Sequence, residues 1–130
     1  MGHGDVVALV DEHFPADSIA RATVHGRPIR LAGIDCTAAA RAILSVLPLD
    51  DTVPEPTRRM VVEGKPEKLP EVQQEVQAEI DAAEGRGVPM GRVGRWEYYD
   101  EARQAYAVVW TGERRVYGCF LFQKGFIRPR

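Results

Sequence analysis

The chain opens with a short, nearly continuous apolar run from Val6 to Val10. The length of this run and its β-branched valines are typical of a buried strand, and the lack of alternation favours a sheet covered on both faces. Asp11 follows directly, so we expect it at the carboxyl end of that strand, where open α/β sheets commonly bind ligands. An aspartate that caps a turn or a helix is the other interpretation of this position.

Two later segments place apolar residues at helical spacing. The clearer stripe consists of Leu69, Val72, Val76, Ile80 and Ala83. Pro70 near its start and Gly85 past its end are typical helix boundaries. A second helix is predicted between Thr37 and Leu47, and Pro48 would end it.

The rest of the pattern alternates shorter strands and helices. It predicts a helical turn through Ile19, strands at Arg59–Glu63, Ala107–Trp110 and Tyr117–Phe122, a short helix from Glu97, and a loop or weak strand at Arg92–Trp96. The chain has 130 residues and no internal repeat. This alternation therefore predicts one α/β domain over residues 1–130.

The composition, with 45% hydrophobic and 28% charged residues, is that of an ordinary globular protein. The net charge of −2 leaves no excess of cations to attract nucleic acid. The longest apolar run is far shorter than the ~20 residues that span a bilayer, and no charged-then-apolar leader opens the chain. We therefore expect a cytoplasmic protein that binds neither nucleic acid nor membranes.

The cysteines and histidines give no metal-binding pattern. Cys36 and Cys119 form no C-x-x-C pair, which predicts two reduced thiols rather than a disulfide framework or a zinc site. His3, Asp11 and His13 also lack a recognised ligand spacing. We therefore predict no metal, and a metal-dependent hydrolase is disfavoured.

Other residues have both a functional and a structural interpretation. His3 lies between two glycines, where it could act as a general acid or base, or simply lie on the surface near a frayed terminus. Trp96 and Tyr99 could stack on a sugar face, although core or interface positions would also explain them. The Glu113–Arg115 turn is typical of a solvated face.

Several short motifs occur in order along nearly the whole chain. They are Gly2-His-Gly-Asp5, Asp11-x-His-Phe-Pro15, Val62-Glu-Gly64, Tyr99-Asp-Glu-Ala-Arg103, Thr111-Gly-Glu-Arg114, Tyr117-Gly118 and Lys124-Gly125. No single motif is diagnostic, but their combination strongly resembles the RbsD/FucU family, and within it the L-fucose mutarotase branch. The resemblance implies a three-layer α/β/α fold with a mixed sheet, a decameric ring of identical subunits, and anomer exchange of a free sugar without a cofactor.

The resemblance also supplies the residue roles. By position, His3 corresponds to the family's catalytic proton donor, and Asp11 and Arg95 correspond to its sugar-binding positions. The segment Tyr117-Gly118-Cys119 occupies the place of its Tyr-Gly-Asn segment. Ring opening requires the hemiacetal hydroxyl to lose a proton while the ring oxygen gains one, and imidazole, carboxylate and guanidinium groups suit these tasks. The general base stays open.

Two features depart from the family. Cys119 stands where the family has an asparagine, and a thiol poorly replaces an amide with two donors and a carbonyl acceptor. This difference bears on which sugar is bound. The family also usually has a helix before the Gly-His-Gly-Asp motif, whereas this sequence begins at the motif.

The candidate site residues His3 and Asp11 are eight positions apart in the sequence. If residues 3 to 11 form a strand, eight steps of ~3.3 Å place His3 and Asp11 roughly 26 Å apart along the chain. Two side chains so far apart cannot contact one small sugar. We therefore hypothesise that the site is completed between subunits, with His3 of one chain facing Asp11, Arg95 and Tyr117 of another.

Two other functions stay open from the sequence. One is a pyranase that exchanges the pyranose and furanose forms of D-ribose, and the other is a non-catalytic sugar-binding or regulatory protein. Aromatic side chains at Trp96 and Tyr99, next to Arg95, slightly favour a sugar with an exposed methyl group, such as L-fucose.

Overall fold

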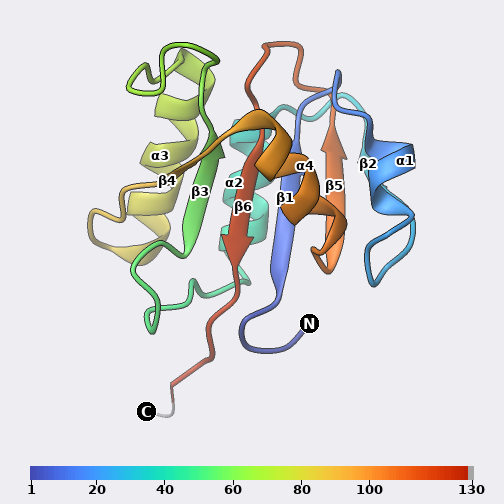
Figure 1. Ribbon diagram of the computed structural model, residues 1–130. Helices are drawn as coiled ribbons and strands as arrows, with labels where there is room; N and C mark the ends of the chain where they lie inside the picture. Colours follow the sequence, from blue (N-terminus) through green and yellow to red (C-terminus); the bar gives the residue numbers. More distant parts are fainter. Residues whose placement is uncertain (129–130) are drawn as a thin grey trace.

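The computed structural model describes residues 1–128, which form a six-stranded sheet with helices on both faces (Figure 1). The strands are β1 (Val6–Val10), β2 (Ile29–Leu31), β3 (Thr57–Met60), β4 (Gly91–Val93), β5 (Ala107–Thr111) and β6 (Phe120–Gln123). The helices are α1 (Ala16–Ala20), α2 (Cys36–Leu44), α3 (Glu71–Glu84) and α4 (Arg95–Arg103). None of the helices within residues 1–128 has the length and apolar character needed to cross a membrane.

The sheet is mixed because one strand is reversed. The strand order is β2-β5-β1-β6-β3-β4, and β6 runs antiparallel to both of its neighbours, β1 and β3. The other pairs are parallel. In Figure 1 the arrow of β6 points down, whereas those of β3 and β5 point up. The first residues of β6 therefore lie beside the carboxyl ends of β1 and β3.

Strand β1 lies at the centre of the core. Ala8, Leu9 and Val10 have no exposed surface. Leu9 packs in the apolar cluster beneath α2 and α3, whereas Ala8 and Val10 pack in the cluster beneath α1 and α4. A strand covered on both faces requires apolar residues at every position, which explains the continuous run in the sequence. The predicted α/β fold class and its three layers are confirmed.

The helix predicted from the clearest stripe is confirmed, although Leu69 precedes it and Ala83 is exposed. Val72, Val76 and Ile80 are buried on the inner face of α3. Pro70 precedes the first turn, and Gly85 ends the helix in the left-handed conformation, with φ of 71°. Glycine adopts this conformation without the steric cost of a Cβ atom, so the sequence signals at both ends have a direct physical cause.

Some strands were misplaced in the prediction. The strand expected at Arg59–Glu63 occupies Thr57–Met60, because the buried Arg59 lies inside the strand and interrupts its apolar pattern. Strand β2 was not predicted, since its three residues lie at the sheet edge and are exposed or half-buried. The last strand was expected from Tyr117 but begins at Phe120, since Tyr117 has a positive φ that an extended strand does not allow.

Other boundaries shifted by a few residues. The helix predicted to start at Glu97 begins at Arg95, directly after Gly94, and it ends before Ala105. The loop or weak strand expected at Arg92–Trp96 is the short strand β4 followed by this helix. Helix α2 ends at Leu44, earlier than predicted.

The turn at Glu113–Arg115, interpreted as a solvated face, is in fact anchored to the core. Only 4% of Glu113 is exposed, and its carboxylate accepts hydrogen bonds from the Cys36 backbone N–H and from the Arg115 guanidinium. Arg115 also donates to both oxygens of Glu75 on α3, at 2.7 and 3.0 Å. The turn that leads to β6 is thus tied to α2 and α3. A charged sequence pattern alone does not distinguish such a network from surface charges.

This network predicts a pH dependence of stability. Hydrogen bonds from the Arg115 guanidinium, and one from the Thr37 hydroxyl, lower the pKa of Glu75 to about 2. A carboxyl whose pKa is lowered by folding stabilises the protein fully above its unfolded pKa, near pH 4.5, and loses this contribution as the pH falls toward 2. The Glu75→Gln variant should therefore unfold at a lower temperature than the native protein at pH 6, and the difference should shrink progressively below pH 4.5.

Thermal unfolding between pH 6 and pH 2.5 measures this effect. Glu71→Gln is the matched control, because Glu71 lies on the same helix but is 80% exposed and 3.7 Å from Arg115. The control should change the unfolding temperature little at any pH. An equal effect of Glu75→Gln at pH 6 and pH 2.5 would contradict the assignment.

Candidate functional site

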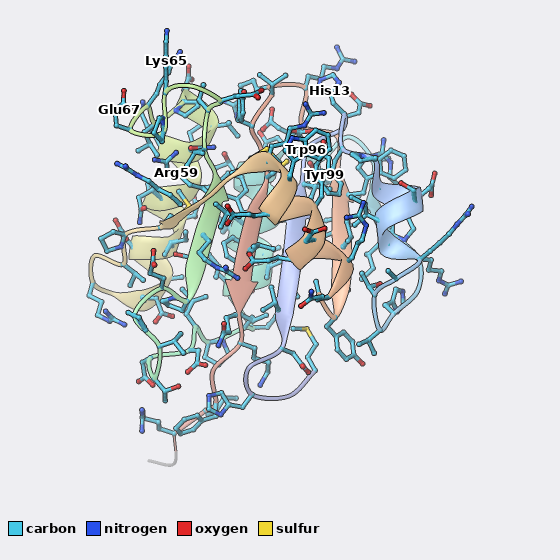
Figure 2. All side chains as sticks on the ribbon, in the orientation of Figure 1. His13, Arg59, Lys65, Glu67, Trp96 and Tyr99 are labelled. Atoms are coloured by element: carbon cyan, nitrogen blue, oxygen red, sulfur yellow. The ribbon has the colours of Figure 1, made fainter. Side chains whose placement is uncertain are left out.

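A cavity of about 290 Å³ opens at the end of the sheet where β1 and β3 terminate and β6 begins. In Figure 2, His13 lies near the top of the molecule, and Trp96 and Tyr99 lie below it, beside the start of α4. Phe14, Met60 and Val116 contribute apolar surface to the cavity. Its polar side chains are Asp11, His13, Glu63, Arg95, Tyr99, Tyr117 and Cys119.

Asp11 leaves β1 into the cavity wall and is 4% exposed. Its Oδ1 accepts from the His13 backbone N–H at 3.0 Å, and its Oδ2 accepts from the Gly118 backbone N–H at 3.0 Å. Burial raises the pKa of the Asp11 carboxyl, and these N–H groups partly offset the effect because they favour the charged form. A carboxylate has about four lone-pair sites, so Asp11 keeps acceptor capacity for a ligand.

Gly118 allows the loop before β6 to approach Asp11 closely. A Cβ atom at this position would lie 3.1 Å from the Asp11 Cβ, 3.2 Å from the Cys36 Sγ and 3.2 Å from the Glu113 Cγ. Any larger residue would push these groups apart. The glycine therefore contributes through its backbone, and its N–H binds the Asp11 carboxylate.

Arg95 begins α4 and lies at the mouth of the cavity. Its Nε donates to the Tyr99 hydroxyl at 3.1 Å, and its guanidinium lies over the Trp96 ring, 4.8 Å from the ring centroid. Gly94 precedes the helix in an extended conformation, and Arg95, Trp96 and Tyr99 contact one another at the start of α4. Tyr98, on the same helix, is fully buried and donates to the Phe120 carbonyl at 2.7 Å, which holds α4 against the sheet.

Cys119 contributes a thiol beside Asp11. Its Sγ lies 3.6 Å from the Asp11 Oδ2, and it is 3% exposed. Burial raises its pKa, so the sulfur stays protonated and acts as a weak donor to the carboxylate. Cys36 lies behind the cavity, where burial raises its pKa to about 12. Both cysteines are free and buried.

His13 and Glu63 line the cavity, and the sequence reasoning did not assign them to a sugar site. The His13 Nε2 lies 2.8 Å from the Arg114 carbonyl oxygen. A carbonyl only accepts hydrogen bonds, so this nitrogen carries the proton. The Glu63 backbone N–H donates to the Tyr117 hydroxyl at 3.2 Å. Both residues belong to motifs that carry the family resemblance, and this membership was the sequence signal that could have assigned them to the site.

The N-terminal segment, which carries His3, lies at the other end of β1 (Figure 1). The His3 Nε2 is 3.1 Å from the Asp50 Oδ1, and the imidazole ring packs edge-on against Phe126. Asp50 accepts further hydrogen bonds from Thr52 and Gln123. These contacts lower the pKa of Asp50, and the hydrogen bond from the Thr52 hydroxyl has the largest effect. The His3 side chain is 45% exposed. The imidazole is thus held in place by a carboxylate while it faces solvent.

The structure therefore divides the predicted site residues into two groups. Asp11, Arg95, Tyr117 and Cys119 line one cavity, with Gly118 bonded to Asp11. His3 of the same chain lies apart from them, beyond the opposite end of β1. Asp50, the carboxylate partner of His3, was not predicted, because it lies in a loop 47 positions away with no distinguishing pattern. Within residues 1–128, no three His, Cys, Asp or Glu side chains cluster in a way that could hold a metal ion.

Comparison with known proteins gives a consistent result. The family model described as the RbsD / FucU transport protein family matches residues 1–127. The L-fucose mutarotase of Actinobacillus pleuropneumoniae is 37% identical over 125 residues, which cover 96% of this chain and 83% of that protein.

Solved structures agree in fold. Protein Atu2016 is 49% identical, with a TM-score of 0.96 over 98% of this chain and 85% of that chain. The fucose mutarotase of Streptococcus pneumoniae, solved in complex with L-fucose, is 29% identical, with a TM-score of 0.85 over 98% of this chain and 87% of that chain. The chain therefore belongs to the RbsD / FucU transport protein family.

Proposed function

We propose that this protein is a sugar mutarotase that interconverts the α and β anomers of a free monosaccharide, with L-fucose as the substrate. The observation that carries the proposal is the cavity beside Asp11. Its volume of about 290 Å³ is at the lower limit of the roughly 300–1,000 Å³ usual for small-molecule sites, which suits a ligand as small as a monosaccharide. The relatives named L-fucose mutarotase support the choice of sugar.

The polar groups of the cavity match the needs of a polyol. Asp11 is assigned as the acceptor that fixes sugar hydroxyls, and Arg95 as a donor to them. Tyr117 and Tyr99 can both donate and accept, and the apolar surface of Phe14 suits a methyl group. Hydrogen bonds to charged groups are the stronger ones, so Asp11 and Arg95 should provide most of the orientation.

The proposed reaction exchanges protons without a cofactor. The proton of the anomeric hydroxyl leaves to a base while the ring oxygen takes one from His3, and the bond between the anomeric carbon and the ring oxygen breaks. The open aldehyde rotates and closes on its other face. Asp50 is an ionised carboxylate that only accepts, so the His3 Nε2 carries a proton. The proton given to the ring oxygen therefore comes from Nδ1 of the doubly protonated imidazolium, which is left as a neutral imidazole.

His3 reaches the sugar in this scheme from a second copy of the chain. Within one chain it lies beyond the end of β1 opposite to the cavity. A solvent-facing imidazole held by Asp50 and flanked by the 40% exposed Phe126 is suited to a contact surface between subunits. Oligomerisation is then a condition of activity, and we propose a closed ring of identical subunits in which each copy supplies His3 to its neighbour.

One observation favours a second candidate function, a non-catalytic sugar-binding protein. Cys119 replaces the asparagine expected from the family pattern, and its sulfur is occupied by Asp11. A thiol offers fewer hydrogen bonds than an amide. If this contact is needed for turnover rather than for binding, the protein would retain affinity for sugar without exchange.

The direct test is NMR saturation transfer between the α and β anomeric protons of L-fucose. The native protein should accelerate exchange, and His3→Ala should reduce the enzymatic rate by about 10²–10⁴-fold, the usual contribution of a general acid or base. His25→Ala is the matched control, because His25 is exposed and lies outside the cavity. Acceleration with D-ribose alone would indicate a pyranase, and binding without exchange of either sugar would indicate the non-catalytic function.

Mixing two inactive variants tests the shared site. His3→Ala lacks the acid but keeps the cavity, whereas Arg95→Ala keeps His3 and lacks the donor. When the two chains are co-expressed in equal amounts, about a quarter of the sites in random mixed rings combine an intact His3 with an intact Arg95 from a neighbour. Exchange should therefore recover to about a quarter of the native rate. No recovery in verified mixed oligomers would contradict a site formed between subunits.

A further inference from the structure

Tyr117 has a backbone conformation that needs an explanation. Among residues 1–128, it is the one non-glycine residue with positive φ, at 63°. Residues with a Cβ atom rarely occupy this left-handed region, and a bulky aromatic residue does so at an energetic cost. Such a conformation persists only where surrounding contacts hold it in place.

The strained residue is also a residue of the cavity. Tyr117 lines the cavity, and its hydroxyl accepts the Glu63 backbone N–H at 3.2 Å. This contact leaves the hydroxyl proton free for a ligand. The backbone conformation of Tyr117 thus determines where one donor of the proposed sugar site lies.

Gln73 on α3 holds this conformation from inside the protein. It has no exposed surface. Its amide Nε2 donates to the Tyr117 carbonyl at 3.0 Å and to the Met60 carbonyl at 2.7 Å. Met60 ends β3 and also lines the cavity. One buried amide therefore joins two cavity-lining segments that are far apart in the sequence.

Arg59 fixes the orientation of that amide. Its Nη1 donates to the Gln73 Oε1 at 2.9 Å, and its guanidinium also donates to the carbonyls of Lys68 and Pro66. A guanidinium only donates, so Oε1 must face Arg59 and the two donors of Nε2 must face the carbonyls. In Figure 2, Arg59 lies below the loop that carries Lys65 and Glu67. Fully paired polar networks of this kind are rigid.

We propose that Gln73 is a positioning residue, which holds the peptide of Tyr117 in its left-handed conformation and so places the Tyr117 hydroxyl against the sugar. The inference rests on the proposed function, because anomer exchange is its kinetic readout. Gln73 does not line the cavity itself and acts through Tyr117.

Gln73→Glu is the most selective variant. A carboxylate still accepts from Arg59, so the buried guanidinium keeps its partner, but it cannot donate to the Tyr117 and Met60 carbonyls. Displacement of Tyr117 should lower the L-fucose exchange rate by ~10-fold or more, since misplacement by about 1 Å can cost up to ~10²-fold. Gln73→Met, which removes all three contacts, serves if the glutamate variant does not fold.

A double-mutant cycle separates positioning from a loss of stability. Tyr117→Phe removes the hydroxyl, so adding Gln73→Glu to it should cause no further loss of exchange rate, whereas independent effects would multiply. Val76→Ala is the control, because Val76 is fully buried on the same helix and makes an apolar contact. It should lower the unfolding temperature and leave the exchange rate unchanged.

A crystal structure of Gln73→Glu provides a readout that does not depend on activity. Tyr117 should leave the positive φ region, and its hydroxyl should lose the Glu63 N–H. Retention of φ near 63°, multiplicative effects in the cycle, or no effect of Tyr117→Phe on exchange would each overturn the proposal. If the native protein exchanges no sugar, the proposed function fails, and this crystal structure alone decides whether Gln73 holds Tyr117.

Discussion

Strand β1 separates the two groups that the proposed site requires, His3 and Asp11. It is a central strand, buried from Val7 to Val10, and it carries Asp11 at one end and the segment with His3 at the other. A rigid strand pinned by β5 and β6 cannot bend to bring the two ends together. The same packing that makes β1 the core of the fold therefore prevents one chain from placing both groups on a monosaccharide. This constraint supports a site that two copies complete.

The reversed strand β6 helps to form the cavity at the carboxyl end of β1. Its start lies beside the ends of β1 and β3, so the loop from Glu113 to Cys119 crosses the edge where parallel strands usually bind ligands. Polar groups, some buried and some half-buried, hold this loop from three directions. Arg115 binds Glu75 on α3, the Gly118 N–H binds Asp11, and the Gln73 amide binds the Tyr117 carbonyl. Such networks cost desolvation, and they fix one geometry when every member is satisfied.

Much of the fold could be predicted from the sequence because its main elements have strong patterns. The valines of β1 and the stripe of α3 report burial directly, since apolar spacing reflects the faces that pack. Strand β2 was missed because an exposed edge strand has no such pattern. Strand β3 was misplaced because it contains the buried Arg59, whose guanidinium is satisfied by hydrogen bonds to carbonyl oxygens.

The site was predictable in part for a related reason. The cavity residues Asp11 and Tyr117 belong to motifs that carry the family resemblance, and Arg95 was assigned from that resemblance by its position. The strand end after Val10 is also a recognisable position. Asp50 and Gln73 gave no signal, because their importance comes from contacts with residues far away in the chain. A sequence pattern reports periodicity and local chemistry, whereas such long-range polar contacts appear only after folding.

The central claim is that each cavity receives His3 from a second copy. The most direct measurement is a crystal structure of the native protein with L-fucose bound. We expect the sugar to lie between Asp11 and Arg95, with an imidazole from another copy within about 2.6–3.2 Å of it, directly or through one water. A sugar bound in this cavity with no imidazole from a second copy near its ring oxygen would contradict the account.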